Sequence, residues 1–91
     1  MRVKYSPLFL LIIKKVDVRI YKSLKSRISI FIQNPNDPQL DNHPLRNEYS
    51  GCRSIDITAD WRAVFKEIHE GEEKVAYFVD LGTHNELYGK H

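Results

Sequence analysis

The chain has 91 residues, of which 42% are hydrophobic, a length and composition that suit one globular domain and are too small for two. It has a single cysteine, Cys52, which excludes an internal disulfide and gives no sign of an oxidising compartment. The apolar run from Leu8 to Ile13 is far shorter than the roughly 18 residues that a membrane span needs. We therefore expect a single domain over 1–91, in the cytoplasm and with no membrane partner.

Positive charge is concentrated in the first part of the chain. Residues 1–36 contain eight Lys and Arg against one acidic residue, Asp17, for a charge of +7, whereas residues 37–91 contain six bases and eleven acids, for −5. The basic part indicates a polyanionic partner, either nucleic acid or an acidic protein. A solvated helix face is the alternative that charge alone leaves open.

The first expected elements are a short strand and two helices. Residues 3–5 can begin a strand, and the serine and proline that follow are typical of a helix N-terminus, which predicts a helix over 6–15. Apolar residues then recur at helical spacing over 17–33, with basic residues between them, which predicts an amphipathic helix. Two prolines within 34–38 end it, because proline lacks the amide hydrogen and restricts the preceding residue.

The second half of the chain predicts an antiparallel sheet. After an ordered loop over 41–50, strands are expected over 54–57, 61–68 and 74–81, the last two joined by a hairpin at 70–71. With the short first strand included, the pattern predicts an α+β fold. Its antiparallel β-sheet has about four strands, and the two N-terminal helices pack on one face.

Alternation within the first strand of this meander separates two faces of the sheet. Ile55 and Ile57 share one face, and Ser54 and Asp56 share the other. If the isoleucines lie under the helices, the polar pair lies on the uncovered face. A ligand is therefore expected on the side of the sheet that carries Ser54 and Asp56.

Three sequence segments resemble the RelE/ParE superfamily of toxins from bacterial toxin–antitoxin systems. The resemblance also includes the basic helical part and the order of the segments along the chain. The segments are DNHPLRNEYSGCRSIDI at 41–57, ADWRAVF at 59–65 and GTHNELYG at 82–89. The most specific motifs are His43-Pro44-Leu45, Gly51-x-Arg53, Asp60-Trp61 and Gly82-Thr83-His84 with Leu87-Tyr88. The resemblance is closest to the YafQ-like branch, extends over nearly the whole chain, and implies a RelE-like microbial ribonuclease-type fold.

This resemblance implies an mRNA interferase, a ribosome-dependent endoribonuclease that cuts messenger RNA in the ribosomal A site. In such relatives the 2′-hydroxyl of the substrate attacks the adjacent phosphate and leaves a cyclic phosphate, so no metal or other cofactor is expected. The implied partners are a cognate antitoxin, the ribosome and messenger RNA. Leu11 and Ile12 make the first helix apolar on more than one face, which suits an antitoxin contact or a dimer surface.

Two histidines fall on the motifs and match the needs of this chemistry. Cleavage requires a base for the hydroxyl proton and an acid for the leaving oxygen, and histidine serves either role near neutral pH. His43 and His84 are the candidates, and the sequence leaves open which is the base and which the acid. Outside the motif context each would be an ordinary loop residue that satisfies a local hydrogen bond. His69 and His91 fall on no motif, and the histidine spacing predicts no metal site.

Further site residues are implied by the resemblance. Arg62 matches a phosphate-contacting arginine of RelE, and its planar fork suits phosphate oxygens. Asp60 matches a functional aspartate of the YafQ-like branch and can orient a histidine, and Tyr88 matches an aromatic residue that stacks on the substrate. Arg53 either contacts RNA or, because it shares a face with the isoleucines of its strand, forms an ion pair at the sheet edge.

The chain departs from the YafQ-like pattern on the same strand. Where that branch carries an aspartate and then a histidine, this chain has Ser54 and Asp56. Asp56 can act as a base or hold His43, but a carboxylate there also repels phosphate. Two alternatives stay open: a ParE-like toxin that binds DNA gyrase without nuclease chemistry, and a weakened relative retained for antitoxin binding. The two histidines favour the nuclease, because a binding-only toxin has no need of proton carriers.

Overall fold

The computed structural model describes residues 1–89, and Lys90 and His91 lie outside it. The fold is α+β, with a five-stranded sheet in the order β1-β5-β4-β3-β2, antiparallel except for the parallel pair of β1 and β5. The elements are β1 (Arg2–Tyr5), α1 (Pro7–Ile13), α2 (Val18–Gln33), η1 (Pro38–Leu40), β2 (His43–Pro44), η2 (Asn47–Tyr49), β3 (Arg53–Asp56), β4 (Trp61–Glu70), β5 (Glu73–Thr83) and α3 (His84–Tyr88).

The two N-terminal helices, α1 and α2, each begin at a residue whose side chain caps the helix. The Ser6 hydroxyl accepts a hydrogen bond from the backbone amide of Phe9 at 3.0 Å, and the Asp17 carboxylate accepts from the amides of Arg19 and Ile20. These bonds satisfy amide groups that have no partner inside the helix. Among residues 1–89, no helix is long and apolar enough to cross a membrane.

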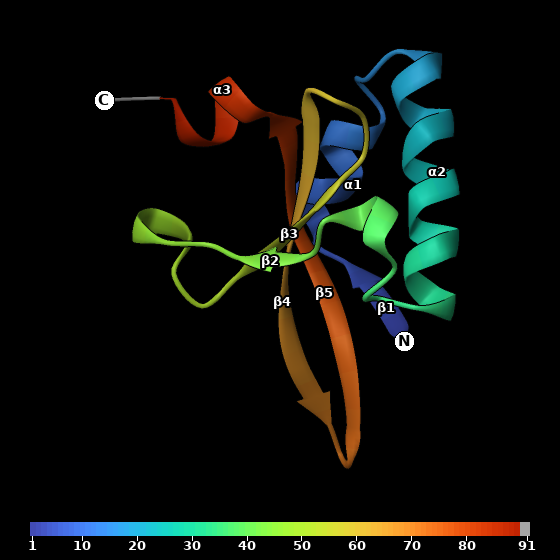
Figure 1. Ribbon diagram of the computed structural model, residues 1–91, viewed down its shortest axis with the longest axis vertical. Coiled ribbons are helices and arrows are strands. Elements are labelled where there is room, and N and C mark those ends of the chain that lie inside the picture. The colour runs from blue at the N-terminus through green and yellow to red at the C-terminus, as the bar shows by residue number, and fades with distance from the viewer. Residues whose placement is uncertain (90–91) are drawn as a thin grey trace.

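The helices α1 and α2 cover one face of the sheet (Figure 1). The core between the layers is built on four fully buried phenylalanines, with ring centroids 5.0–5.6 Å apart in four pairs. These are Phe9 of α1, Phe31 of α2, Phe65 of β4 and Phe78 of β5. Such tilted and edge-on pairs add to the stabilisation that apolar burial gives.

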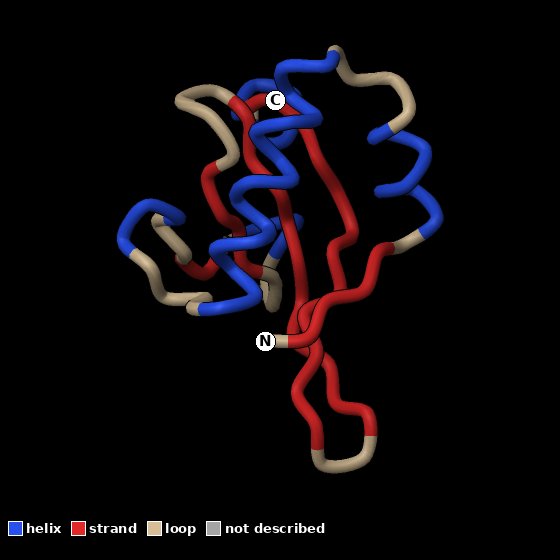
Figure 2. The backbone as a smooth tube through the Cα atoms, turned by 90° about the vertical axis from the view of Figure 1, so that its right-hand side faces the viewer, coloured by secondary structure: helices blue, strands red, loops and turns tan. Residues whose placement is uncertain are grey.

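The strands β4 and β5 form a long hairpin that projects beyond the helices (Figures 1 and 2). Its turn contains Gly71 with a positive φ of 63°, which glycine adopts without steric cost. Further along, Phe78 pairs with Phe65 but Asp80 pairs with Val64, so the residue between them in β5 has no partner. This bulge resets the alternation, and the side chains of Phe78 and Leu81 both join the core.

The structure corrects three details of the sequence-based expectation. The sheet has five strands, because two residues of the expected loop, His43 and Pro44, pair with β3. The segment after β5 is a helix, α3, which begins with a capping box between Thr83 and Glu86. The side of the sheet opposite α1 and α2 is covered in part by η2 and α3 (Figure 1), and Ser54 is fully buried there.

Candidate functional site

Alternate residues of β3, β4 and β5 point to the side of the sheet opposite α1 and α2. Between β3 and β4, Ser54 lies across from Val64 and Asp56 lies across from Arg62. Between β4 and β5, Asp80 lies across from Val64 and Gly82 lies across from Arg62. Directly opposed residues share a face. We call this side, formed by Ser54, Asp56, Arg62, Val64, Asp80 and Gly82, the site face.

His43 reaches the site face from β2, where it pairs with Ser54. Its Nδ1 lies 2.7 Å from the backbone carbonyl oxygen of Asp41, and its Nε2 lies 3.5 Å from the Ser54 hydroxyl. A carbonyl oxygen only accepts hydrogen bonds, so Nδ1 carries the proton in the neutral ring. The lone pair of the neutral imidazole is therefore on Nε2, which points to the site face, and the side chain is 44% exposed.

His84 is the first residue of α3 and is exposed. Its backbone amide donates to the carbonyl oxygen of Asp60 at 2.9 Å, which ties α3 to the turn between β3 and β4. Its ring packs edge-on against Tyr88, one helical turn later, with centroids 4.9 Å apart. Asp60 contacts His84 through its backbone, and within residues 1–89 its carboxylate forms no hydrogen bond or ion pair.

Two tyrosines cover the centre of the site face. The rings of Tyr88 and Tyr49 meet edge-on at 5.9 Å, and the Tyr49 hydroxyl donates to the Asp80 carboxylate at 2.9 Å. Burial, and then the bond to Asp80, raise the pKa of Tyr49 to about 12. The Tyr88 hydroxyl is buried without an aligned partner in the described residues, and burial raises its pKa while the neighbouring Ser54 hydroxyl opposes the shift. His43 thus contacts Ser54, and His84 contacts Tyr88, whose hydroxyl is a neighbour of Ser54.

The guanidinium of Arg62 is held by the protein itself. Its Nε lies 2.9 Å from Asp56 Oδ1, although the N–H is not aligned with that oxygen, and its Nη1 donates to the carbonyl oxygens of Thr58, Ala59 and Trp61 at 3.0–3.2 Å. The side chain is only 17% exposed. Burial raises the pKa of the Asp56 carboxyl, while Arg62 acts in the opposite direction. Much of the positive charge on the site face is therefore already paired.

Arg53 does not join these residues. It alternates with Ser54 and so points to the other side of the sheet, where its Nε donates to the side-chain oxygen of Asn42 at 2.8 Å. This bond holds the segment that precedes β2. The structure thus places His43, His84, Asp56, Arg62 and Tyr88 on or beside the site face, Asp60 at its edge through the backbone, and Arg53 elsewhere.

Sequence comparisons give no relative, since neither a protein-family model nor a curated protein matches the chain. Solved structures, in contrast, do match the chain. YafQ from E. coli strain BL21(DE3) superposes with a TM-score of 0.76 at 26% identity, over 98% of this chain and 100% of that one. The chain has the fold of the YafQ-like toxins of the RelE/ParE superfamily.

Two other solved structures agree in fold with this YafQ-like chain. A YoeB/ParE toxin from Agrobacterium tumefaciens has a TM-score of 0.72 at 20% identity, over 92% of this chain and 99% of that one. The toxin–antitoxin complex of E. coli DinJ and YafQ has a TM-score of 0.73 at 24% identity, with 96% of each chain covered. At these identities the likeness shows the fold alone.

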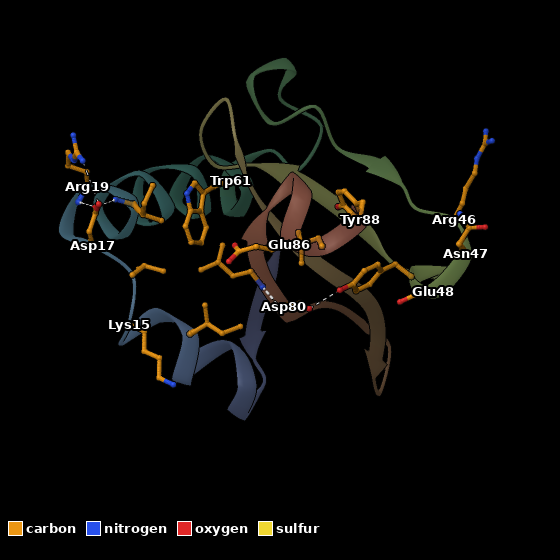
Figure 3. A pocket seen from close by; sticks show the side chains of 16 residues that line it. Lys15, Asp17, Arg19, Arg46, Asn47, Glu48, Trp61, Asp80, Glu86 and Tyr88 are labelled. Atoms are coloured by element: carbon orange, nitrogen blue, oxygen red, sulfur yellow. Dashed lines mark hydrogen bonds and ion pairs between the residues drawn. The ribbon is translucent and has the colours of Figure 1, made fainter. Parts of the chain in front are cut away.

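A groove of about 900 Å³ adjoins the site face of the YafQ-like chain (Figure 3). It extends from the turn between α1 and α2 to η2, and Trp61, Asp80, Glu86 and Tyr88 line it. Because Asp80 belongs to both, the groove and the site face are parts of one continuous surface.

Tyr49 and Asp80 are site residues that sequence reasoning missed. Tyr49 lies in the segment expected to be a loop, where an aromatic residue between polar neighbours was the available signal. Asp80 follows the bulge in β5, so simple alternation would place it beside Phe78 in the core. No pattern in the sequence marks the bulge.

Proposed function

We propose that this protein is the toxin of a type II toxin–antitoxin pair and acts as a ribosome-dependent mRNA interferase. In this proposal it cleaves messenger RNA in the ribosomal A site, in the cytoplasm, and a cognate antitoxin protein silences it. The structural likeness to YafQ supports the toxin role, and the solved complex of DinJ and YafQ supports an antitoxin partner. The two histidines on the site face support the nuclease activity.

The hydrogen bonds of His43 are the main support for the proposal, in which His43 is the general base. Its Nδ1 proton is bound to the Asp41 carbonyl, which leaves the Nε2 lone pair directed over the site face. Hydrogen bonding at one ring nitrogen fixes which nitrogen is free to accept a proton. His84 is exposed and held against Tyr88, and takes the role of the acid.

The proposed reaction is an intramolecular transesterification. His43 Nε2 removes the proton of the ribose 2′-hydroxyl, and the oxygen attacks the adjacent phosphorus. The bond from phosphorus to the 5′-oxygen of the next nucleotide breaks, and protonated His84 gives its proton to that oxygen. The products are a 2′,3′-cyclic phosphate and a free 5′-hydroxyl, and no metal or other cofactor takes part.

The remaining residues have supporting roles in this proposal. Arg62 contacts the phosphate through Nη2, which makes no hydrogen bond within residues 1–89, while Nε and Nη1 hold it in place. Tyr88 fixes the ring of His84 and offers an aromatic surface to the substrate. Asp56 holds Arg62, and Asp60 supports α3 through its backbone. Arg53 acts structurally through Asn42 rather than on RNA.

A second candidate is a ParE-like toxin that binds DNA gyrase, or a weakened relative retained for antitoxin binding. The observation that favours it is the excess of carboxylates on the site face. Asp56 and Asp80 lie there, and the one cation of this face, Arg62, is paired with Asp56. Carboxylates repel phosphate unless cations outweigh them.

The deciding experiment adds the purified protein to a cell-free translation reaction and maps message ends by primer extension. Ribosome-dependent cuts are expected for the wild type, and His43→Ala or His84→Ala should reduce the cutting rate by about 100-fold or more, as loss of a proton-transfer group does. His69→Ala is the matched control, because His69 is exposed on β4 near the end of the hairpin.

Equal loss in all three variants would mean that the effect is not chemical. Translation arrest without cut messages, or DNA breaks in a gyrase reaction, would reject the nuclease in favour of the second candidate.

A further inference from the structure

One sequence motif, Gly51-x-Arg53, has no part in the proposed cleavage step, because Arg53 points away from the site face. Gly51 has a φ of 89°, which glycine adopts without steric cost, and it lies in the turn that leads from η2 into β3. Arg53, the first residue of β3, is half-buried across from Pro44 of β2. The motif therefore places a guanidinium beside β2, the short strand that carries His43 (Figure 1).

Arg53 holds Asn42, the residue that precedes β2. Its Nε donates to Asn42 Oδ1 at 2.8 Å, and its Nη2 lies 3.5 Å from the Asn42 carbonyl oxygen. The side-chain amide of Asn42 in turn donates to the carbonyl oxygen of Pro35 at 2.9 Å. All three contacts are partly buried, and a charged donor strengthens the first two. Asn42 thus connects β3 with the loop that follows α2.

The residue before Asn42 supplies the acceptor for His43. Asp41 has the left-handed conformation, with a φ of 47° and a ψ of 49°, which aspartate tolerates better than most residues. In this conformation its carbonyl oxygen lies 2.7 Å from His43 Nδ1. The bond is exposed, so water competes for both groups. It therefore lasts only as long as the backbone of Asp41 and Asn42 is held in place.

The other contacts of the His43 ring do not select a tautomer as strictly. The Ser54 hydroxyl, 3.5 Å from Nε2, can donate or accept and so fits either tautomer. The Asp41 carboxylate is 71% exposed and lies 3.8 Å from Nδ1, which is too long for a hydrogen bond. Within residues 1–89, the backbone carbonyl of Asp41 is thus the acceptor that keeps the ring proton on Nδ1.

We propose that Arg53 and Asn42 are positioning residues for the general base, because they hold the Asp41 carbonyl against His43 Nδ1 and so keep the lone pair on Nε2. This proposal rests on the nuclease proposed above, and it adds the residues that maintain the active tautomer of the base. With the proton on Nε2, the neutral ring has no lone pair there and cannot accept the proton of the 2′-hydroxyl. Neither Arg53 nor Asn42 contacts RNA in this arrangement.

The test measures the tautomer of His43 in the full chain, without ribosome or message. At alkaline pH, where the ring is neutral, ¹⁵N NMR distinguishes the protonated ring nitrogen from the bare one, and His43→Ala assigns the signals. Asn42→Leu and Arg53→Met should each lower the ratio of the Nδ1–H to the Nε2–H tautomer about fivefold, as loss of one hydrogen bond does. Asn42→Asp keeps an acceptor for Arg53 and should restore most of the ratio. Arg53→Lys gives the same comparison if Arg53→Met does not fold.

Arg27→Met is the matched control. Arg27 also donates to a carbonyl oxygen of this loop, that of Gln39 at 2.8 Å, but it forms no hydrogen bond with residues 41–43. Its loss should lower the free energy of unfolding without changing the tautomer. Asp41→Asn removes the carboxylate, tolerates the left-handed conformation and should also keep the tautomer. The double variant of Asn42→Leu with Arg53→Met should change the ratio no more than either single variant, because both break one link.

A cleavage measurement separates positioning from RNA binding. In the cell-free translation assay, Asn42→Leu and Arg53→Met should slow cutting about two- to fivefold at saturating toxin, because the active tautomer is depleted rather than removed. The toxin concentration that gives half-maximal cutting should stay unchanged, whereas loss of an RNA contact would raise it.

The proposal is overturned if neither Asn42→Leu nor Arg53→Met changes the tautomer, or if Arg27→Met changes it as much. An equal change in Asp41→Asn would assign the tautomer to the carboxylate and overturn it as well. Because the NMR sample contains no ribosome or message, its result is independent of the cleavage test. A tautomer that responds as expected in a protein that cuts no message would overturn only the proposed nuclease.

Discussion

The two faces of the sheet use alternate residues of the same strands for opposite purposes. On the helix side, β4 and β5 contribute Phe65 and Phe78 to a dry aromatic core. On the site face the same strands contribute Arg62 and Asp80. Arg62 pairs with Asp56, and Asp80 accepts a hydrogen bond from the Tyr49 hydroxyl. The core face therefore fixes the strands, and the site face then holds charged groups in place by short contacts between side chains.

The largest loss of stability is expected on the core side, from Phe78→Ala. The Phe78 ring contacts those of Tyr5, Phe9, Phe31 and Phe65, with centroids 5.1–6.1 Å apart. Truncation leaves a cavity that the neighbouring rings cannot fill, and we expect the free energy of unfolding to fall by about 3–5 kcal/mol. Urea denaturation followed by circular dichroism measures this loss. A loss below about 1 kcal/mol would show that the core rearranges freely.

The helical half and the core side were predictable because their signals are local. Serine and aspartate caps precede periodic apolar runs, and both helices begin at those caps. The strand β2 was missed because two residues carry no periodicity, and α3 because its five residues follow a strand without a break. Its capping box, Thr83 with Glu86, was the signal that could have found it.

The site face was predictable only as far as alternation reaches. Parity within β3 correctly assigned Ser54 and Asp56 to one side of the sheet. It could not show that Tyr49 and Tyr88 meet over this face, since Tyr49 lies in the irregular segment before β3 and Tyr88 lies in the terminal helix α3. It also could not show that Arg62 is held by the carbonyl oxygens of its own turn, because backbone acceptors leave no trace in the sequence.

A smaller effect is expected from Arg62→Ala, which tests how far the site face contributes to stability. The substitution removes three hydrogen bonds to the turn and leaves the Asp56 carboxylate without its cation, so we expect a loss of about 2 kcal/mol. It should also weaken the proposed message cleavage, while binding of the proposed antitoxin stays intact. Denaturation, primer extension and a pull-down measure the three effects separately.

The matched control for Arg62→Ala is Asp56→Asn. Burial raises the pKa of Asp56 in the folded state, so its ionisation opposes folding, and this cost is present above the raised pKa and disappears as pH falls below it. The stability of the Asn variant relative to that of the wild type should therefore be highest near pH 7 and should fall as the pH falls toward 3. If Asp56→Asn is as destabilising as Arg62→Ala at neutral pH, the ion pair rather than the turn holds Arg62.

The smallest effect is expected from Tyr49→Phe, which removes one hydroxyl from the site face. The lost hydrogen bond to the Asp80 carboxylate should lower stability by about 1 kcal/mol, whereas Tyr77→Phe should leave stability nearly unchanged, since the Tyr77 hydroxyl has no hydrogen bond within residues 1–89. Ring packing against Tyr88 is retained in both variants, so their difference isolates the bond.

The pH dependence of the wild type and of the Tyr49→Phe variant gives an independent measure of the bond between Tyr49 and Asp80. The folded-state pKa of Tyr49 is raised to about 12, above the ordinary value of about 10, so the hydroxyl stabilises the fold below pH 10. That contribution is lost as pH rises from about 10 to 12, because the unfolded chain releases this proton first. Subtracting the ultraviolet titration of the Phe variant from that of the wild type should isolate one tyrosine that ionises near pH 12. A midpoint near 10 would mean that η2 does not rest on the sheet, and that Tyr88 is held by α3 alone.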